Sequence, residues 1–334
     1  MFNDEMLLEI PLNNLYDMMC ASFSDLSRMN KSDLSGDAFD KVENMLSAIF
    51  VMGILRQFKR GLYKEYIPSE GLVPTMKGKI DIPETIRLKT QISRQVYCHY
   101  DEFSANNIYN QILKAFLLLI LKRGRVGINQ RKRVKQLMIS FNDVSDISLG
   151  GVAWGKLSYE KNKFHYKMLI NIGYMIYKNI HIDPETKRDY LDWNSIEQIY
   201  RQFVYTFFQE ECKGIKVQHD KITSDDAIGG DFILKKEDRV MIMHTNLSKE
   251  VCNEEDLKSK KEFMLAEIKK MFYVVDEKTT LIGRMTGVLL YPSMSSSFVD
   301  KYEIEGYTIY MATFNLRSSI PEIKNDLRKI SELI

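Results

Sequence analysis

Three polar residues, Asp231, His244 and Asn246, have the spacing of a phosphodiester-cleaving site but only part of its chemistry. Asp231 precedes an apolar run, the charged turn KKED follows, and His244 and Asn246 lie in the next run, RVMIMHTNL. Two-metal cleavage needs carboxylates that hold Mg²⁺ over the phosphate, and a cation or base that positions the attacking water. Because strand side chains alternate, His244 and Asn246 share one face with Val240 and Ile242. The geometry of an acid-x-lysine pair is therefore kept while its groups are exchanged.

The exchanged groups fit metal-dependent cleavage poorly. Imidazole is a weak substitute for a carboxylate at Mg²⁺, and the neutral amide of Asn246 brings no charge to a phosphate. A rearranged centre would combine Asp231, the metal ligand if there is one, with neighbouring groups. The candidates are Asp225, Asp226, Lys249 and Glu250. The alternative, which the residues favour, is a structural hairpin in which His244 and Asn246 are packing residues, so whether the chain is an enzyme stays uncertain.

The elements that must position these residues follow from periodicity. Apolar residues at helical spacing predict helices over 15–27, 37–61, 106–123, 131–141 and 160–180, with short β-like runs between Gly and Pro in 62–100. A polar patch at 181–194 is the expected domain boundary. Beyond it we expect a helix over 194–212, two strands around KKED, a helix over 254–275, strands at 287–292 and 308–316, and a last helix from about 321. Helix, hairpin, crossover helix and strand is the order of a PD-(D/E)xK nuclease core.

The fold class predicted is thus α+β or α/β: an N-terminal mixed α/β domain over 1–185, then a nuclease-like core over 186–334 with a mixed sheet flanked by helices. The 334 residues have a formal net charge of only +2, and the four cysteines lack metal-binding spacing. No P-loop sequence is present, and the most apolar run, AFLLLILK, is too short to span a bilayer. We expect a cytoplasmic protein without membrane contact and without a nucleotide of its own.

Several motifs together resemble one family. The opening EIPLNNLYDMM, the signature RGLYKEYIPSEGLVPTMKGKIDIPETIR, the stretch HYDEFSANNIYNQILKAFL, the helix IYRQFVYTFF and the closing strands GVLLYP and YEIEGYTIYMATFNL are similar, in order and spacing, to McrC. McrC is the nuclease subunit of the McrBC modification-dependent restriction systems, which act in antiviral defence. The resemblance runs nearly from end to end.

The resemblance implies a two-part molecule and a partner. The N-terminal part of McrC plugs the channel of a hexameric ring of McrB, an AAA+ GTPase, and stimulates its hydrolysis; the C-terminal part is the nuclease. By position, Asp231 matches the first metal-binding acid, and His244 and Asn246 stand where the family has Asp and Lys. A family glutamine falls near Leu265, and a position often acidic in relatives is Arg201. GTP would be bound by the partner, Mg²⁺ by this chain only if its centre is active, and modified DNA would be read by the partner.

Two further segments are candidate contact sites. The loop residues Lys77, Gly78 and Lys79 are candidates for contact with the ring, the alternative being a plain β-turn. Residues 103–142 contain no acid and eight basic residues. The nucleic-acid-binding candidates are Lys122, Arg123, Arg125, Arg131, Lys132, Arg133 and Lys135. That run would contact a phosphate backbone or acidic loops of a ring, or it is simply a solvated face.

Three functions stay open at this point. The chain is an accessory subunit that binds and stimulates an AAA+ GTPase with little cleavage of its own, or an active Mg²⁺-dependent DNA endonuclease subunit with a rearranged centre, or a stand-alone nucleic-acid-binding protein. The broken acid-x-lysine pair favours the first, and the near-neutral charge disfavours the third.

Overall fold

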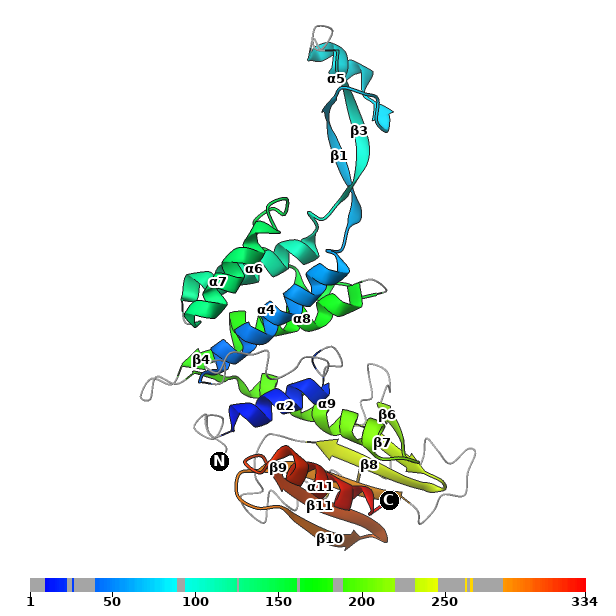
Figure 1. The fold of residues 1–334 in the computed structure, drawn as a ribbon. Helices are drawn as coiled ribbons and strands as arrows, with labels where there is room; N and C mark the ends of the chain where they lie inside the picture. Colours follow the sequence, from blue (N-terminus) through cyan, green and yellow to red (C-terminus); the bar gives the residue numbers. More distant parts are fainter. Residues whose placement is uncertain are drawn as a thin grey trace. The chain divides into compact units, whose positions relative to one another are not determined.

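The computed structural model describes residues 10–22, 26, 40–88, 94–124, 126–160, 163–182, 189–219, 232–245, 262, 265–266 and 285–334. The chain forms two compact units. Residues 46–178 make one, and residues 1–45 together with 179–334 make the other. Figure 1 shows the elements of each.

A helical body forms most of the first unit. Its helices are α4 (Val42–Arg60, most of which lies in this unit), α6 (Ile108–Arg123), α7 (Ile128–Ile139) and α8 (Phe164–Tyr174), which continues as a π-helix over Met175–Asn179. Phe116 of α6 is fully buried and meets Phe50 of α4 edge to face, with ring centroids 5.8 Å apart. A Cβ on Gly173 would lie 2.2 Å from the Phe116 ring, so α8 passes this close only because residue 173 has no side chain.

A long two-stranded ribbon projects from this helical body (Figure 1). β1 (Glu65–Val73) pairs antiparallel with β3 (Val96–Ser104), from Glu65↔Ser104 to Val73↔Val96. The short β2 (Lys79–Ile80) pairs with β3, and the helix α5 (Ile82–Arg87) follows it at the far end. At about 3.3 Å per residue, strands of this length reach roughly 30 Å. The sequence predicts short β-like runs over 62–100, and β1 and β3 are strands within this range.

A mixed six-stranded sheet is the centre of the second unit, in the order β10-β11-β9-β8-β7-β6. The strands are β6 (Lys216–His219), β7 (Phe232–Lys236), β8 (Arg239–Thr245), β9 (Met285–Ser293), β10 (Phe298–Ile304) and β11 (Tyr307–Asn315). β8, β9 and β11 run parallel, whereas the β6–β7, β7–β8 and β10–β11 pairs are antiparallel. A mixed sheet with flanking helices confirms the predicted fold class.

Helices α9 (Trp193–Glu211) and α11 (Ile320–Ser331) pack with this sheet. Tyr200 of α9 stacks on Phe314 of β11 at 5.4 Å, and its hydroxyl donates to the Leu290 carbonyl at 3.3 Å. Phe208 lies against Phe232 of β7. Phe232 and Phe314 lie on one face of the sheet. The residues that alternate with them along the strands, such as Ile233 and Met311, lie on the other face, in an apolar cluster described below. Two further short strands, β4 (Ile180–Ile182) and β5 (Asp189–Leu191), pair before α9.

The first helix, α2 (Leu12–Ser22), belongs with the second unit. The Asn14 side-chain amide donates to the carbonyls of Leu316, at 2.7 Å, and Ser318, at 2.8 Å. The contact units therefore differ from the expected ranges 1–185 and 186–334 at the N-terminus, while the chain passes into the second unit at Asn179, close to the expected boundary. Periodicity finds an apolar helix face but not which distant segment it covers.

Candidate functional site

His244 is the one residue of the expected cleavage triplet that lies within the described residues. Asp231 and Asn246 lie outside them, as do the alternative donors Asp225, Asp226, Lys249 and Glu250. His244 is half-buried near the end of β8 and lies opposite Leu289 of β9. By strand alternation it shares a face with Val240 and Ile242.

That face of the sheet is an apolar cluster. Nine buried residues form it: Ile233, Val240, Ile242, Leu265, Met285, Leu289, Tyr291, Ile309 and Met311. Leu265, where the resemblance places a glutamine, is only 7% exposed and packs within this cluster. Burial raises the pKa of the Tyr291 phenol well above its ordinary value. Aliphatic neighbours and one imidazole do not fit Mg²⁺, which prefers carboxylate and water oxygens.

Within the described part of the chain, no three His, Cys, Asp or Glu side chains gather as a metal site would require. Arg201, where the resemblance implies an acid, forms an ion pair with Glu197 one turn earlier, at 2.7 Å. This position therefore carries a guanidinium that is paired with Glu197, in place of a carboxylate.

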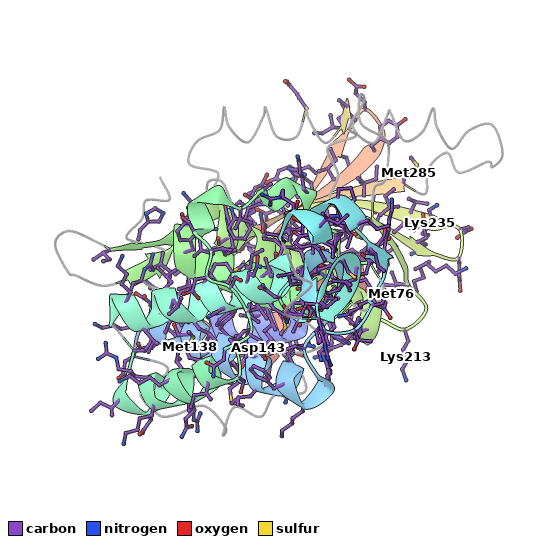
Figure 2. All side chains as sticks on the ribbon, turned by 90° about the horizontal axis from the view of Figure 1, so that it is seen from above. Met76, Met138, Asp143, Lys213, Lys235 and Met285 are labelled. Carbon is purple, nitrogen blue, oxygen red and sulfur yellow. The ribbon has the colours of Figure 1, made fainter. Side chains whose placement is uncertain are left out.

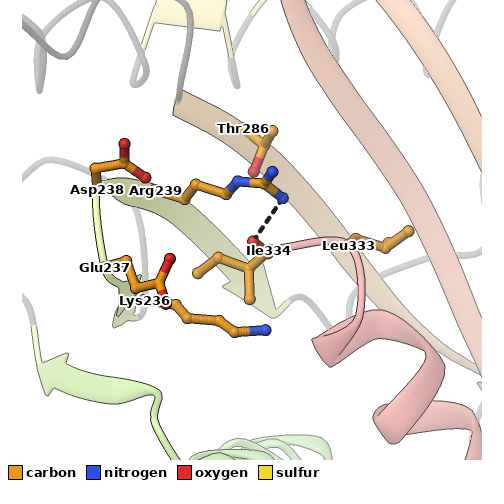
Figure 3. Close-up of a pocket in the computed structure, with 7 residues that line it drawn as sticks. All are labelled: Lys236, Glu237, Asp238, Arg239, Thr286, Leu333 and Ile334. Carbon is orange, nitrogen blue, oxygen red and sulfur yellow. Dashed lines mark hydrogen bonds between the residues drawn. The ribbon is translucent and has the colours of Figure 1, made fainter.

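A polar cavity of about 580 Å³ lies at the opposite end of β8 (Figure 3). It is lined by Lys236, Glu237, Asp238, Arg239, Thr286, Leu333 and Ile334. Arg239 donates to the Ile334 main-chain oxygen at 3.2 Å. Arg239 begins β8 and His244 lies five residues later, about 16 Å along the strand. This cavity is thus separate from His244.

The ribbon tip holds the second set of expected site residues. Gly78 has φ +68°, and a Cβ there would lie 2.3 Å from the His99 carbonyl oxygen. Lys77 places its ammonium 4.1 Å from the centroid of the Tyr100 ring, and Lys79 pairs with His99 in the β2–β3 ladder. The three residues therefore form a tight turn packed onto β3, beside a cavity of about 680 Å³ that Gly78 and Lys79 help to line.

His99 links three elements of this tip. Its Nδ1 is 3.0 Å from a Glu70 carboxylate oxygen on β1, and its Nε2 is 3.1 Å from an Asp81 carboxylate oxygen. Asp81 also accepts a hydrogen bond from the Glu84 amide at 2.9 Å and so caps α5. That hydrogen bond, and then the one from His99, hold the pKa of Asp81 below its ordinary value of 3.8. The sequence gives no signal for this link, because its residues are far apart along the chain.

Large apolar side chains are exposed at the same tip. Met76, labelled in Figure 2, is 67% exposed, and Ile82 and Ile86 of α5 are 63% and 64% exposed. No residue of α5 is buried. Ile82 and Ile86 are four residues apart and therefore lie on one side of the helix. An apolar patch at the end of a projecting element is typical of a protein-binding site.

The root of the ribbon is held by hydrogen bonds of three buried residues. Asn107 and Asn110 at the start of α6 each donate to the Tyr63 carbonyl at 2.8 Å. Tyr166 of α8 donates to Asn110 Oδ1 at 2.7 Å and accepts from the Tyr63 amide at 2.9 Å. The Lys163 ammonium lies over the rings of Tyr63 and Tyr109. The asparagines of the stretch HYDEFSANNIYNQILKAFL thus fix the direction in which the ribbon leaves the helical body, a role that residue types alone do not reveal.

The expected basic run is divided by the structure. Arg123 donates to the carbonyls of Ile176, at 2.6 Å, and Tyr177, at 3.1 Å, and so caps the π-helix. Arg131 donates to the Leu121 carbonyl at 3.3 Å. Lys122, Lys132 and Lys135 are exposed, Arg133 is half-buried, and Arg125 lies outside the described residues.

None of the described helices is long and apolar enough to cross a membrane. Residues 11–278 match the family described as McrBC 5-methylcytosine restriction system component. The chain is 22% identical over 343 aligned positions to the type IV methyl-directed restriction enzyme EcoKMcrBC of Escherichia coli (strain K12), an alignment that covers 96% of this chain and 97% of the relative.

A solved structure has a similar fold. It is a chain of the refined half-complex from the tetradecameric assembly of Thermococcus gammatolerans McrB AAA+ hexamers with bound McrC. The TM-score is 0.57 at 13% identity, and the match covers 97% of this chain and 76% of that chain. At this identity the likeness supports the fold alone.

Proposed function

The chain belongs to the family of McrBC 5-methylcytosine restriction system components, and on that premise we propose that it is a McrC-like subunit of an antiviral restriction system. It binds a hexameric McrB-like AAA+ GTPase ring, stimulates GTP hydrolysis by that ring, and has a degenerate nuclease centre. GTP and the modified DNA are bound by the partner.

The observation that carries the proposal is the ribbon with its exposed apolar tip. A single ribbon is about as wide as two strands 4.8 Å apart, narrow enough to enter the channel of a ring. Met76, Ile82 and Ile86 gain from burial only when a partner covers them. The buried hydrogen bonds of Asn110 and Tyr166 keep the ribbon in one orientation, so little order is lost on binding.

The apolar surroundings of His244 support the degenerate centre. Ile242 and Leu289 flank this position, and Leu265 packs on the same face. A carboxylate is costly to desolvate in such surroundings, whereas a half-buried imidazole is tolerated. The resemblance implies an aspartate at this position, and the imidazole of His244 is the group that fits the apolar cluster better.

Paired assays with the cognate ring test both parts of the proposal. The chain is added to the ring with GTP and a methylated duplex, with Mg²⁺ or Mn²⁺, and GTP hydrolysis and DNA cleavage are measured together. We expect faster GTP hydrolysis and no cleavage. An unchanged GTPase rate would refute the accessory role. Cleavage that is lost in Asp231→Ala would instead establish a rearranged, active endonuclease.

A restored variant tests the degenerate centre directly. His244→Asp combined with Asn246→Lys returns the acid-x-lysine pair, and we expect it to gain Mg²⁺-dependent cleavage if Asp231 still binds metal. The matched control is His244→Asn with Asn246→Gln, which alters the same positions without restoring either charge. Equal cleavage by both variants would show that the pair is irrelevant.

A further inference from the structure

The exposed face of α7 carries a regular stripe of two kinds of side chain. Ile128, Lys132, Lys135 and Ile139 follow one another at spacings of four, three and four residues. At 3.6 residues per turn they fall within an arc of about 60° and span about 16 Å along the axis. Ile128 is 77% exposed, Ile139 is 68% exposed, and both lysines are exposed. The opposite side of α7, with Val134 and Leu137, is buried.

The stripe differs from an ordinary solvated helix face. Such a face mixes acidic and basic residues, whereas no acid occurs anywhere in residues 103–142. Two β-branched side chains that are each more than two-thirds exposed stand at the two ends of the lysine pair. A helix that lays one face into a groove on another protein presents its contact residues on a single side in this way, here an apolar residue at each end and two lysines between them.

The side chains left on this surface favour a protein over nucleic acid. Arginine recognises phosphates best because its planar guanidinium donates two parallel hydrogen bonds. The guanidinium of Arg123 already donates to the Ile176 and Tyr177 carbonyls, and that of Arg131 donates to the Leu121 carbonyl. On the stripe itself, two lysines lie between two isoleucines. A phosphate backbone offers nothing apolar to cover the isoleucines.

We propose that α7 docks into an apolar groove with acidic residues midway along it, on the rim of the AAA+ ring around its channel. This inference rests on the proposed function and adds a second contact to it. The ribbon and α7 belong to the same compact unit, and α6 packs against α7. A body of several helices, each about 10 Å across, cannot follow a two-stranded ribbon into a channel. Its own surface therefore meets the rim of the ring while the tip is inside.

Affinity for the cognate ring, assembled with a non-hydrolysable GTP analogue, tests the proposal with the full chain. Ile128→Ser/Ile139→Ser is expected to weaken ring binding by roughly tenfold or more, since two isoleucines that the groove would bury are lost. Lys132→Glu/Lys135→Glu is expected to weaken it similarly, with a loss that shrinks as salt is raised. Matched controls are Val299→Ser, an exposed apolar residue of β10, and Lys156→Glu, an exposed lysine of the first unit.

The outcomes separate this inference from the proposed function. If the unmodified chain does not bind the ring, both are overturned. If it binds and the α7 variants bind equally well, only the α7 contact is overturned. Binding to a 30-base-pair duplex is measured in parallel as a function of salt. Loss of duplex binding in the lysine variant, with unchanged ring binding in the isoleucine variant, would assign the stripe to DNA and also overturn the proposal.

Discussion

Tyr166 and Asn110 are joined by a buried hydrogen bond of 2.7 Å between the phenol and the amide oxygen. The same phenol oxygen accepts from the Tyr63 amide at 2.9 Å, and the Asn110 amide donates to the Tyr63 carbonyl at 2.8 Å. Side chains of two helices thus bind both backbone polar groups of Tyr63, which lies two residues before the ribbon begins. Position and direction of the ribbon are set at its root.

Tyr166→Phe removes only the hydroxyl and leaves the Tyr63 amide and the Asn110 oxygen without this partner. We expect the free energy of unfolding to fall by about 1–3 kcal/mol, because buried polar groups that lose their partner retain their desolvation cost. Urea unfolding measures it. Tyr66→Phe is the control, since Tyr66 is 71% exposed and should change stability by less than about 0.5 kcal/mol. Equal effects of the two changes would contradict a structural role for the hydrogen bonds between Tyr166, Asn110 and Tyr63.

The raised pKa of the Tyr166 phenol leads us to expect a loss of stability at alkaline pH. Burial raises its pKa to about 12 from an ordinary 10.0. Between these values the unfolded chain releases the proton and the folded chain keeps it, so the stabilisation is complete below pH 10 and is lost as the pH rises toward 12. The difference in unfolding free energy between the unmodified chain and Tyr166→Phe should therefore shrink over that interval. A difference that stays constant from pH 9 to 12 would rule this out.

The sequence predicts those parts of the molecule whose pattern is local. The helix over 106–123 and its end at Gly124 follow from apolar spacing and a C-terminal glycine, and the structure has α6 end there with Gly124 in the left-handed region. The two strands around KKED are confirmed by β7 and β8. The sequence pattern does not predict the edge strand β10, because its first four residues, Phe298 to Lys301, are exposed and only Tyr302 and Ile304 alternate inward.

What depends on distant residues was not predictable in this way. The spacing of His244 and Asn246 indicates one face of a strand, but only the packed structure brings Leu265 and Leu289 to that face. Likewise, a run of basic residues does not reveal that Arg123 caps a π-helix more than fifty residues away. Local patterns establish which elements form, whereas tertiary packing decides which charged side chains stay available to a partner.

Gly78→Ala should disturb the ribbon tip. An L-residue at φ +68° costs roughly 1–2 kcal/mol, and its Cβ would also meet the His99 carbonyl oxygen at 2.3 Å. We expect faster amide hydrogen exchange across β2 and α5 and weaker stimulation of the ring. Gly71→Ala in β1 is the matched control, because a Cβ there has nothing within 4 Å. Identical exchange in both variants would mean that the turn tolerates a side chain.

The Asp81 cap makes the tip sensitive to acid. The Glu84 amide and then His99 lower the pKa of Asp81 below 3.8. A depressed carboxylate pKa stabilises the folded tip above the ordinary value, and this contribution is lost as the pH falls through the lower folded value. NMR should show the Glu84 amide losing its hydrogen bond only below pH 3.8. Asp81→Asn keeps a capping oxygen but cannot titrate, so persistence of the same transition in this variant would exclude the Asp81 carboxylate as its cause.

The apolar tip provides the most direct test of how the ribbon acts. Ile82→Ser/Ile86→Ser changes two residues that are 63% and 64% exposed. They lie on α5, in which no residue is buried. Stability of the isolated chain should stay within about 0.5 kcal/mol of its original value, because little buried surface is lost. Stimulation of GTP hydrolysis should fall by roughly tenfold or more at a fixed subunit concentration, since the apolar surface that a ring covers is removed.

Raising the concentration of the variant distinguishes the two ways in which this loss can arise. Recovery of full stimulation at high concentration would mean that the isoleucines contribute affinity, whereas a plateau below the original rate would mean that the tip itself positions the groups that hydrolyse GTP. Unchanged stimulation at every concentration would remove the tip from the interface and leave the ribbon without its assigned role.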